Sequence, residues 1–194
     1  MLHLIKLCMI IIMKKVIMIL AVMSISTLTY SQESLKWEEV VTVDSTVNKT
    51  ELFNRARQWF SSTFRSEKDV ISVSDKESGE ISGNAVLKYK SDRFYVGVVC
   101  VNGYVNFKIN VYVKDGRYKY VFHSFDHEGS FYEGNKPISY GILTNSASAP
   151  KPTRGSANNK AWAEIKDQTA SQVNELINSL KTAMSQKSEI QDNW

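Results

Sequence analysis

Hydrophobic and polar residues alternate most regularly between Tyr104 and Phe125, in the sequence YVNFKINVYVKDGRYKYVFHSF. Before the turn, apolar residues occupy every second position from Val105 to Val113, and Asn106, Lys108 and Asn110 lie between them. This period of two is typical of strands with one buried and one solvated face. The pair Asp115-Gly116 separates two such runs and predicts a hairpin turn in which both residues have positive φ. We therefore expect two long antiparallel strands joined by this pair.

The register of this hairpin decides which side chains share a face. A two-residue turn places Lys114 opposite Arg117 and Val113 opposite Tyr118, so the buried parity switches across the turn. On this register the buried face collects Ile109, Val111, Val113, Tyr118, Tyr120 and Phe122. The opposite face collects Tyr104, Lys108, Tyr112, Arg117 and Lys119.

A first helix is predicted immediately after residue 48. Asn48 can cap it, and Glu51 lies at the third position to complete a capping box. The apolar positions form one helical stripe that consists of Leu52, Phe53, Ala56, Trp59, Phe60 and Phe64. So many large side chains require a sheet to cover them. Arg55 and Arg57 flank the stripe, and we expect both to be solvated.

Further strands are predicted on either side of this helix. Residues 35–43 alternate as a first strand, 70–74 form a short one, and 81–89 are in phase for another. The run 94–101 is apolar on both parities, which favours a central strand covered on both sides. Asn102-Gly103 after it is a second two-residue hairpin signal. We expect four consecutive antiparallel strands between residues 81 and 125.

The chain changes character after Phe125. All three prolines lie between residues 126 and 158, and 144–158 has no hydrophobic period. We expect a long Pro/Ser/Asn-rich surface loop over 126–158, mobile in its second half, with a short edge strand at 139–143. A second helix is predicted over 159–185, and its apolar face consists of Trp162, Ile165, Val173, Leu176, Ile177, Leu180 and Met184. Residues 186–194 form a polar tail.

The order of these elements predicts an α+β domain of the β-α-β4-α type. Consecutive strands joined by short turns form an antiparallel, curved sheet, and the two amphipathic helices pack on one of its faces. Residues 32–125 supply the sheet and the first helix, and 159–185 complete the same domain.

The N-terminal segment, residues 1–31, is predicted to be a secretory signal peptide. Met13-Lys14-Lys15 provides a basic region, an apolar stretch follows, and small residues precede a cleavage point near Ser31-Gln32. Met13 is a second candidate for the true start. The alternative is an uncleaved membrane anchor over residues 2–23, which Lys6 and the two later lysines interrupt. We expect a periplasmic or extracellular protein.

Cleavage of this segment changes the charge and cysteine content. The chain of 194 residues has a formal net charge of +4, and residues 1–31 contain three lysines and no acidic residue. The remaining 163 residues therefore carry +1, which does not favour nucleic acid or an anionic membrane as a partner. Cys8 leaves with the segment, so Cys100 is a lone cysteine that cannot form an internal disulfide.

Three motifs resemble a known family. They are KTELFNRARQWFSSTF at 49–64, VKDGRYKY at 113–120, and the terminal helix that opens with Trp162. Together they resemble a secreted bacterial family of unknown function with a fold like that of the TATA-binding protein (TBP-like). The resemblance implies the same β-α-β4-α architecture. It implies no activity, because the family has no assigned catalytic or ligand residues, and the fold does not imply DNA binding.

Two local clusters have residue types found in catalytic or metal sites. His123 and His127 would share a face of a regular strand about 13 Å apart, which is too far for one metal ion. Asp75, Glu77 and Glu80 surround a predicted turn, where a solvated hairpin tip is the simpler explanation than paired catalytic carboxylates. We therefore assign no catalytic, metal or cofactor residues.

The solvated hairpin face provides the candidate binding residues. Aromatic rings beside cations can stack on sugars or bases, so Tyr104, Tyr112 and Lys119 are the candidate ligand face. A solvated face on which Tyr112 contacts Lys119 explains the same pattern without a ligand.

The leading interpretation is an exported, non-enzymatic binding or structural module of the cell envelope, with no cofactor. Its partner would be an envelope protein or a small ligand and not nucleic acid. A membrane is expected as a partner only if the N-terminal segment stays uncleaved. The alternative is an envelope hydrolase with a site at the sheet end near His123 and His127.

Overall fold

The structure is a computed structural model that describes residues 13–15, 32–64, 70–91, 98–131, 134, 136–150 and 156–186. The chain divides into two units, Met1–Gln32 and Glu33–Trp194. Of the first unit only three residues and Gln32 are described, so the expected signal peptide and its cleavage point lie almost entirely outside the described residues. Within the described part, no helix is long and apolar enough to cross a membrane.

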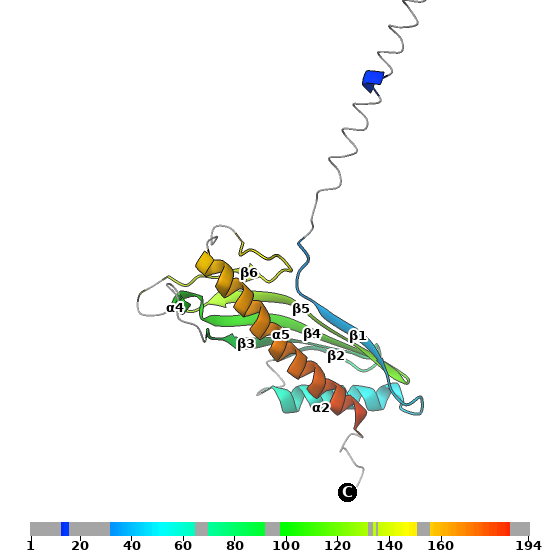
Figure 1. The fold of residues 1–194 in the computed structure, drawn as a ribbon. Coiled ribbons are helices and arrows are strands. Elements are labelled where there is room, and N and C mark those ends of the chain that lie inside the picture. Colours follow the sequence, from blue (N-terminus) through cyan, green and yellow to red (C-terminus); the bar gives the residue numbers. More distant parts are fainter. Residues whose placement is uncertain are drawn as a thin grey trace, which may run out of the picture. The chain divides into compact units, whose positions relative to one another are not determined.

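Glu33–Trp194 is built on one antiparallel sheet with helices on one side. The elements in chain order are β1 (Trp37–Thr42), α2 (Lys49–Thr63), β2 (Ile71–Asp75), β3 (Glu80–Tyr89), α4 (Val98–Val101), β4 (Gly103–Lys114), β5 (Arg117–Gly129), β6 (Gly141–Ile142) and α5 (Ser156–Ser185). The strand order is β1-β5-β4-β3-β2, and β6 pairs with β5 beyond the end of β1. Helix α5 runs obliquely across the sheet and α2 lies near one of its ends (Figure 1). The predicted α+β class, with both helices on one face, is confirmed.

The β4–β5 hairpin has the predicted register. Lys114 pairs with Arg117 and Val113 with Tyr118, and the six residues predicted to be inward are all buried. The predicted turn geometry is wrong, because only Gly116 has a positive φ, of 68°. The reason is tertiary: the Gly116 N–H donates to the Val47 carbonyl at 2.9 Å, so the loop ahead of α2 holds the turn in place.

The N-terminus of α2 is capped from two directions. Asn48 Oδ1 accepts a hydrogen bond from the Glu51 N–H at 2.9 Å, as predicted. Asp115 Oδ1, from the hairpin turn, accepts from the Lys49 N–H at 2.6 Å. Because the first N–H groups of a helix have no partner within it, both contacts satisfy donors that would otherwise require water. The hairpin turn and the helix therefore fix each other's position.

The two helices and the inner sheet face form one core. Trp59 and Phe60 of α2 are buried, and the Trp59 indole N–H donates to Ser179 Oγ on α5 at 3.0 Å. Gly83 of β3 lies against Phe60, because a Cβ there would be 3.0 Å from the Phe60 ring and 2.8 Å from the Val70 carbonyl. The glycine thus lets α2 approach the sheet closely. Leu180 and Met184 of α5 complete the buried cluster.

Arg55 contradicts the expectation of a solvated side chain. It is only 5% exposed, and its Nη1 donates to the Met184 carbonyl in the last turn of α5 at 2.8 Å. Its Nε donates to Glu51 Oε1 at 2.9 Å, which pairs the buried charge. Helix C-termini leave carbonyls without partners, and the guanidinium satisfies one of them. The other flanking residue, Arg57, is exposed as expected.

The strand expected over 94–101 is wrong. Val98–Val101 form the short helix α4, while residues 92–97 lie outside the described part. Strand β3 pairs directly with β4, with Tyr89 opposite Gly103, so no hairpin turn forms at Asn102-Gly103. An apolar run on both parities is equally compatible with a short helix packed on a core, and periodicity alone does not distinguish the two.

The segment expected to be a surface loop is partly built into the domain. Strand β5 continues to Gly129, and β6 confirms the short edge strand expected within 139–143. In the described part, Leu143 and Ala149 are buried. The Trp162 indole N–H donates to the Ser146 carbonyl at 2.8 Å, which fixes this segment on α5. The second half of the segment includes residues 151–155, which are outside the described residues.

We expect Trp59→Ala to lower the free energy of unfolding by about 3–5 kcal/mol, because it leaves a cavity between helix and sheet. It also removes the hydrogen bond to Ser179. Chemical denaturation measures the loss. The neighbouring Gln58→Ala, at an exposed position, is the control and should change stability by about 0.5 kcal/mol or less. Equal losses in the two variants would contradict a core centred on Trp59.

We expect Asp115→Ala to destabilise the domain by about 1 kcal/mol, the usual effect of losing a helix N-cap acceptor. The expectation is unusual because Asp115 is 66 residues from the helix start that it caps. Urea denaturation should give a similar loss for Asn48→Ala. Lys114→Ala, next to Asp115 and exposed, is the control. If Asp115→Ala matched Lys114→Ala, the turn would not stabilise α2.

Candidate functional site

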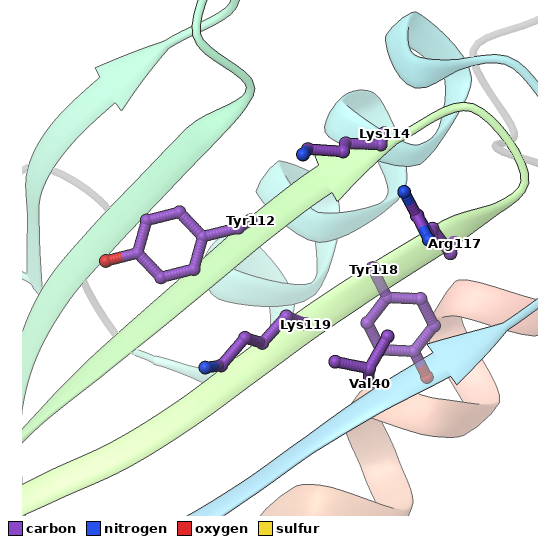
Figure 2. A pocket seen from close by; sticks show the side chains of 6 residues that line it. All are labelled: Val40, Tyr112, Lys114, Arg117, Tyr118 and Lys119. Carbon is purple, nitrogen blue, oxygen red and sulfur yellow. The ribbon is translucent and has the colours of Figure 1, made fainter.

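The sheet face opposite the helices is open and carries a hollow of about 390 Å³. Strands β1, β4 and β5 contribute its lining residues, which are Val40, Tyr112, Lys114, Arg117, Tyr118 and Lys119. Figure 2 shows Tyr112 and Lys119 side by side on adjacent strands, with the helices behind the sheet. Two of the three residues predicted for the ligand face, Tyr112 and Lys119, therefore line the same hollow.

The register of the hairpin produces this arrangement. Tyr112 pairs with Lys119 across β4 and β5. Their strand neighbours Val111, Val113 and Tyr120 are buried on the helix side, so the alternation turns Tyr112 and Lys119 outward. Tyr112 is 39% exposed and Val40 on β1 is 58% exposed, which leaves an apolar and aromatic surface open to a ligand.

Cations surround this apolar surface. Lys119 Nζ is 3.1 Å from Glu38 Oε2, and Lys36 Nζ is 3.0 Å from the other oxygen of Glu38. Hydrogen bonds from Lys36 and then Lys119 lower the pKa of Glu38, which keeps it ionised. In the part of the chain that the structure describes, neither Lys114 nor Arg117 forms an ion pair. The hollow therefore presents two uncompensated cations beside an exposed tyrosine ring.

Tyr104 does not belong to this hollow. It lies on the same face and strand but eight residues from Tyr112, which is roughly 26 Å along an extended chain. Its register partner is Glu128, and it is 47% exposed. The candidate ligand face thus divides, and only Tyr112 and Lys119 lie close enough to contact one small ligand.

His123 and His127 point to opposite faces, because a bulge interrupts β5. Lys108 pairs with His123 and Asn106 with Asp126, so two residues of β5 lie opposite the single residue between them on β4. The extra residue reverses the alternation. His127 consequently enters the core, while His123 stays on the open face. The structure does not unite the two histidines in one site, and among the described residues no cluster of three metal-ligand side chains occurs.

His127 is a structural residue. It is fully buried, its Nε2 lies 2.8 Å from the Val101 carbonyl, and its Nδ1 accepts from the Tyr140 N–H at 3.2 Å. A carbonyl accepts only, so Nε2 carries the proton and Nδ1 does not. Burial lowers the pKa of His127, which keeps the ring neutral. It links α4, β5 and the segment before β6.

His123 belongs to a chain of polar side chains that crosses three strands. Its Nε2 is 2.7 Å from Asn110 Oδ1, and its Nδ1 is 2.8 Å from Ser124 Oγ. Asn110 Nδ2 donates to Ser82 Oγ at 2.7 Å, which donates in turn to Glu80 Oε1 at 2.7 Å. The sequence analysis missed this chain. Its only sequence signal is polar residues at outward positions of neighbouring strands, which is common on solvated sheets.

The acidic residues near the β2–β3 turn do not form a pair across a cleft. Asp75 Oδ1 accepts from the Glu77 N–H at 2.9 Å and from the Ser78 N–H at 3.2 Å. These bonds close the turn, and those from Ser78 contribute most to lowering the pKa of Asp75. Glu80 instead takes part in the polar chain. The expected hairpin tip accounts for Asp75 without catalysis.

Residues 37–128 match the model of a family described as a domain of unknown function (DUF4468) with TBP-like fold. Over these residues, the chain is similar to the DUF4468 family. Two solved structures resemble this chain. A TBP-like protein from Parabacteroides distasonis shares 12% identity with a TM-score of 0.56, covering 76% of this chain and 93% of its own. A DUF4468 family protein from Bacteroides ovatus shares 13% identity with a TM-score of 0.55, covering 81% and 90%.

These similarities establish the TBP-like fold of the chain and confirm the resemblance noted from its motifs. No curated protein matches it. At such low identity the solved structures carry no information about ligands, so any function must be argued from the site itself.

We expect the stability of this domain to fall as the pH drops below about 6.5, the ordinary pKa of histidine. The unfolded chain binds a proton there that buried His127 does not, so protonation favours unfolding until the lower pKa of the folded state is reached. Urea denaturation between about pH 7.5 and pH 5 measures this slope. His127→Gln should flatten it more than His123→Gln, because His123 is less buried. An unchanged slope in His127→Gln would contradict the neutral buried ring.

Proposed function

We propose that this chain is an exported binding module of the cell envelope whose open sheet face binds a small acidic saccharide. The observation that supports it is the hollow at Tyr112, where an exposed aromatic ring lies among Lys114, Arg117 and Lys119. The pattern of residues 1–31 supports export. The ligand class follows from the chemistry of the hollow.

Three features of the hollow favour an acidic sugar. Its volume of about 390 Å³ is in the range of small-ligand sites. The Tyr112 ring and the neighbouring Val40 offer an apolar surface on which the C–H face of a sugar ring can stack. Arg117 can bind a carboxylate with two parallel hydrogen bonds, and Lys114 adds charge. A uronic acid unit combines an apolar ring face with a carboxylate and therefore meets all three requirements.

Ligand binding on the open face would also explain why the Tyr112 ring remains exposed there. The helices cover most of the inner face, so the exposed aromatic and cationic side chains of the hairpin lie on the outer one. Because Lys119 is already paired with Glu38, Lys114 and Arg117 are the cations that gain most from an acidic ligand. Long-range attraction should be modest, because the predicted charge after cleavage is only +1.

We expect a trigalacturonate to bind the purified protein more tightly than its methyl ester, which keeps the sugar rings and removes the charges. Isothermal titration calorimetry measures both. Tyr112→Ala and Arg117→Gln should each weaken binding of the acid by about tenfold, equivalent to about 1.4 kcal/mol. Arg117→Gln should also remove most of the preference for the acid over the ester.

Tyr104→Ala is the matched control, because Tyr104 has the same residue type, strand and face but lies outside the hollow. It should leave the affinity unchanged. Equal affinity for the acid and the ester would contradict a contribution of Lys114 and Arg117 to binding. Equal losses of affinity in Tyr104→Ala and Tyr112→Ala would show that the hollow is not the binding site. No binding of the trigalacturonate to the parent protein would overturn the proposed ligand class.

A further inference from the structure

In the row of hydrogen-bonded side chains on the open face, each group can be assigned as donor or acceptor. These assignments determine which ring nitrogen of His123 carries the proton. The Glu80 carboxylate at one end only accepts, so the Ser82 hydroxyl donates to it. Ser82 Oγ must then accept from the Asn110 amide nitrogen, which turns the amide oxygen toward His123. An amide oxygen only accepts, so His123 Nε2 carries the proton.

The other ring nitrogen of His123 is therefore an acceptor. Nδ1 lies 2.8 Å from Ser124 Oγ, so the Ser124 hydroxyl donates its proton to the imidazole. This is the arrangement of an activated nucleophile: a hydroxyl bonded to a neutral imidazole whose second nitrogen is held by an orienting acceptor. Asn110 occupies the position of the orienting group.

The backbone presents the Ser124 hydroxyl at the surface. Ser124 has a φ of 59°, and among the described residues it is the only non-glycine residue with positive φ. Such a conformation is unfavourable for a side chain with a Cβ and persists where the surrounding structure enforces it. The bulge in β5 provides this constraint and leaves Ser124 exposed.

A second hollow, of about 380 Å³, lies beside this pair. It is lined by Ser34, Leu35, Lys36, Val121, His123 and Ser124. Lys36 lies in this lining, and its Nζ is paired with Glu38 Oε1 at 3.0 Å. Burial, followed by the charges of Lys108 and Lys36, lowers the pKa of His123, so the ring is neutral at neutral pH.

We propose that Ser124 is a nucleophile activated by His123, and that the chain accepts an acyl group from an ester seated in this second hollow. Asn110 is a positioning residue that holds the imidazole in the productive tautomer. This inference does not rest on the proposed saccharide binding, because the two hollows share no lining residue.

The reaction requires only the ester and water. Ser124 Oγ forms a bond to the ester carbonyl carbon while its proton passes to His123 Nδ1. The bond from that carbon to the alcohol oxygen then breaks, and the leaving alcohol takes the proton from Nδ1. Water attacks the acyl-serine in the second half, its proton passes to Nδ1 and then to Ser124 Oγ, and the carboxylic acid is released.

The test uses p-nitrophenyl acetate with the purified full-length protein. Release of p-nitrophenolate gives the rate, and peptide mass spectrometry after an acid quench locates the acetyl group. We expect acetylation of Ser124 and its complete loss in Ser124→Gly, a change that the positive φ favours and that should not reduce thermal stability. Ser74→Ala, at an exposed serine on β2, is the control and should react like the parent.

The pH profile separates catalysis from a structural role. Acetylation of the parent should rise with deprotonation of His123, with a midpoint below about 6.5. His123→Gln should slow it about a hundredfold or more, the usual contribution of a general base. Asn110→Leu should slow it less and leave the midpoint below the ordinary histidine value, because burial and the charges of Lys108 and Lys36 still act on the ring. The charged groups that set this midpoint in the parent are Lys36 and Lys108.

Three results would overturn the proposal. They are absence of an acetyl-Ser124 peptide in the parent, equal labelling of Ser74 and Ser124, and a rate in His123→Gln equal to that of the parent. Each is distinct from failure of saccharide binding, because the Tyr112→Ala variant should be acetylated at the parental rate.

Discussion

Burial of one face of the β4–β5 hairpin against two helices is the interaction on which the rest of the structure depends. Each strand presents an apolar row to the core, and Trp59 of α2 and Leu180 of α5 are buried in the same cluster. Because side chains alternate strictly, burying one parity exposes the other. The open face is thus a direct consequence of the core, and both candidate sites lie on it.

Contacts distant in sequence hold this arrangement in one register. Asp115 satisfies the first N–H of α2, and Arg55 satisfies a carbonyl at the end of α5. Each contact joins the terminus of a helix to another element, at a position where backbone groups have no partner within the helix. They connect the hairpin, the first helix and the last helix into one unit. Neither increases the apolar core, yet both restrict how the helices can sit on the sheet.

The bulge in β5 lets one strand contribute side chains to the open face and to the core. Before it, the outward residues line the hollow at Tyr112; at it, Ser124 is exposed beside His123; after it, the alternation reverses and His127 enters the core. An uninterrupted strand would have placed both histidines on the open face. The single extra residue therefore separates His123 on the open face from the buried His127, which holds the segment before β6.

Local pattern was sufficient to predict the hairpin, its register, the capped first helix and the α+β class, because alternation and capping involve residues close in sequence. It also placed Tyr112 opposite Lys119, since hairpin register follows from the turn. It misassigned Val98–Val101, because an apolar run without a period fits helix and strand alike. Tertiary structure alone decided the remaining features. They are the hollow, the burial of Arg55, the backbone conformation of Asp115 and the hydrogen-bonded side chains from Glu80 to Ser124. Each depends on groups brought together from distant elements, and a single sequence does not contain their distances.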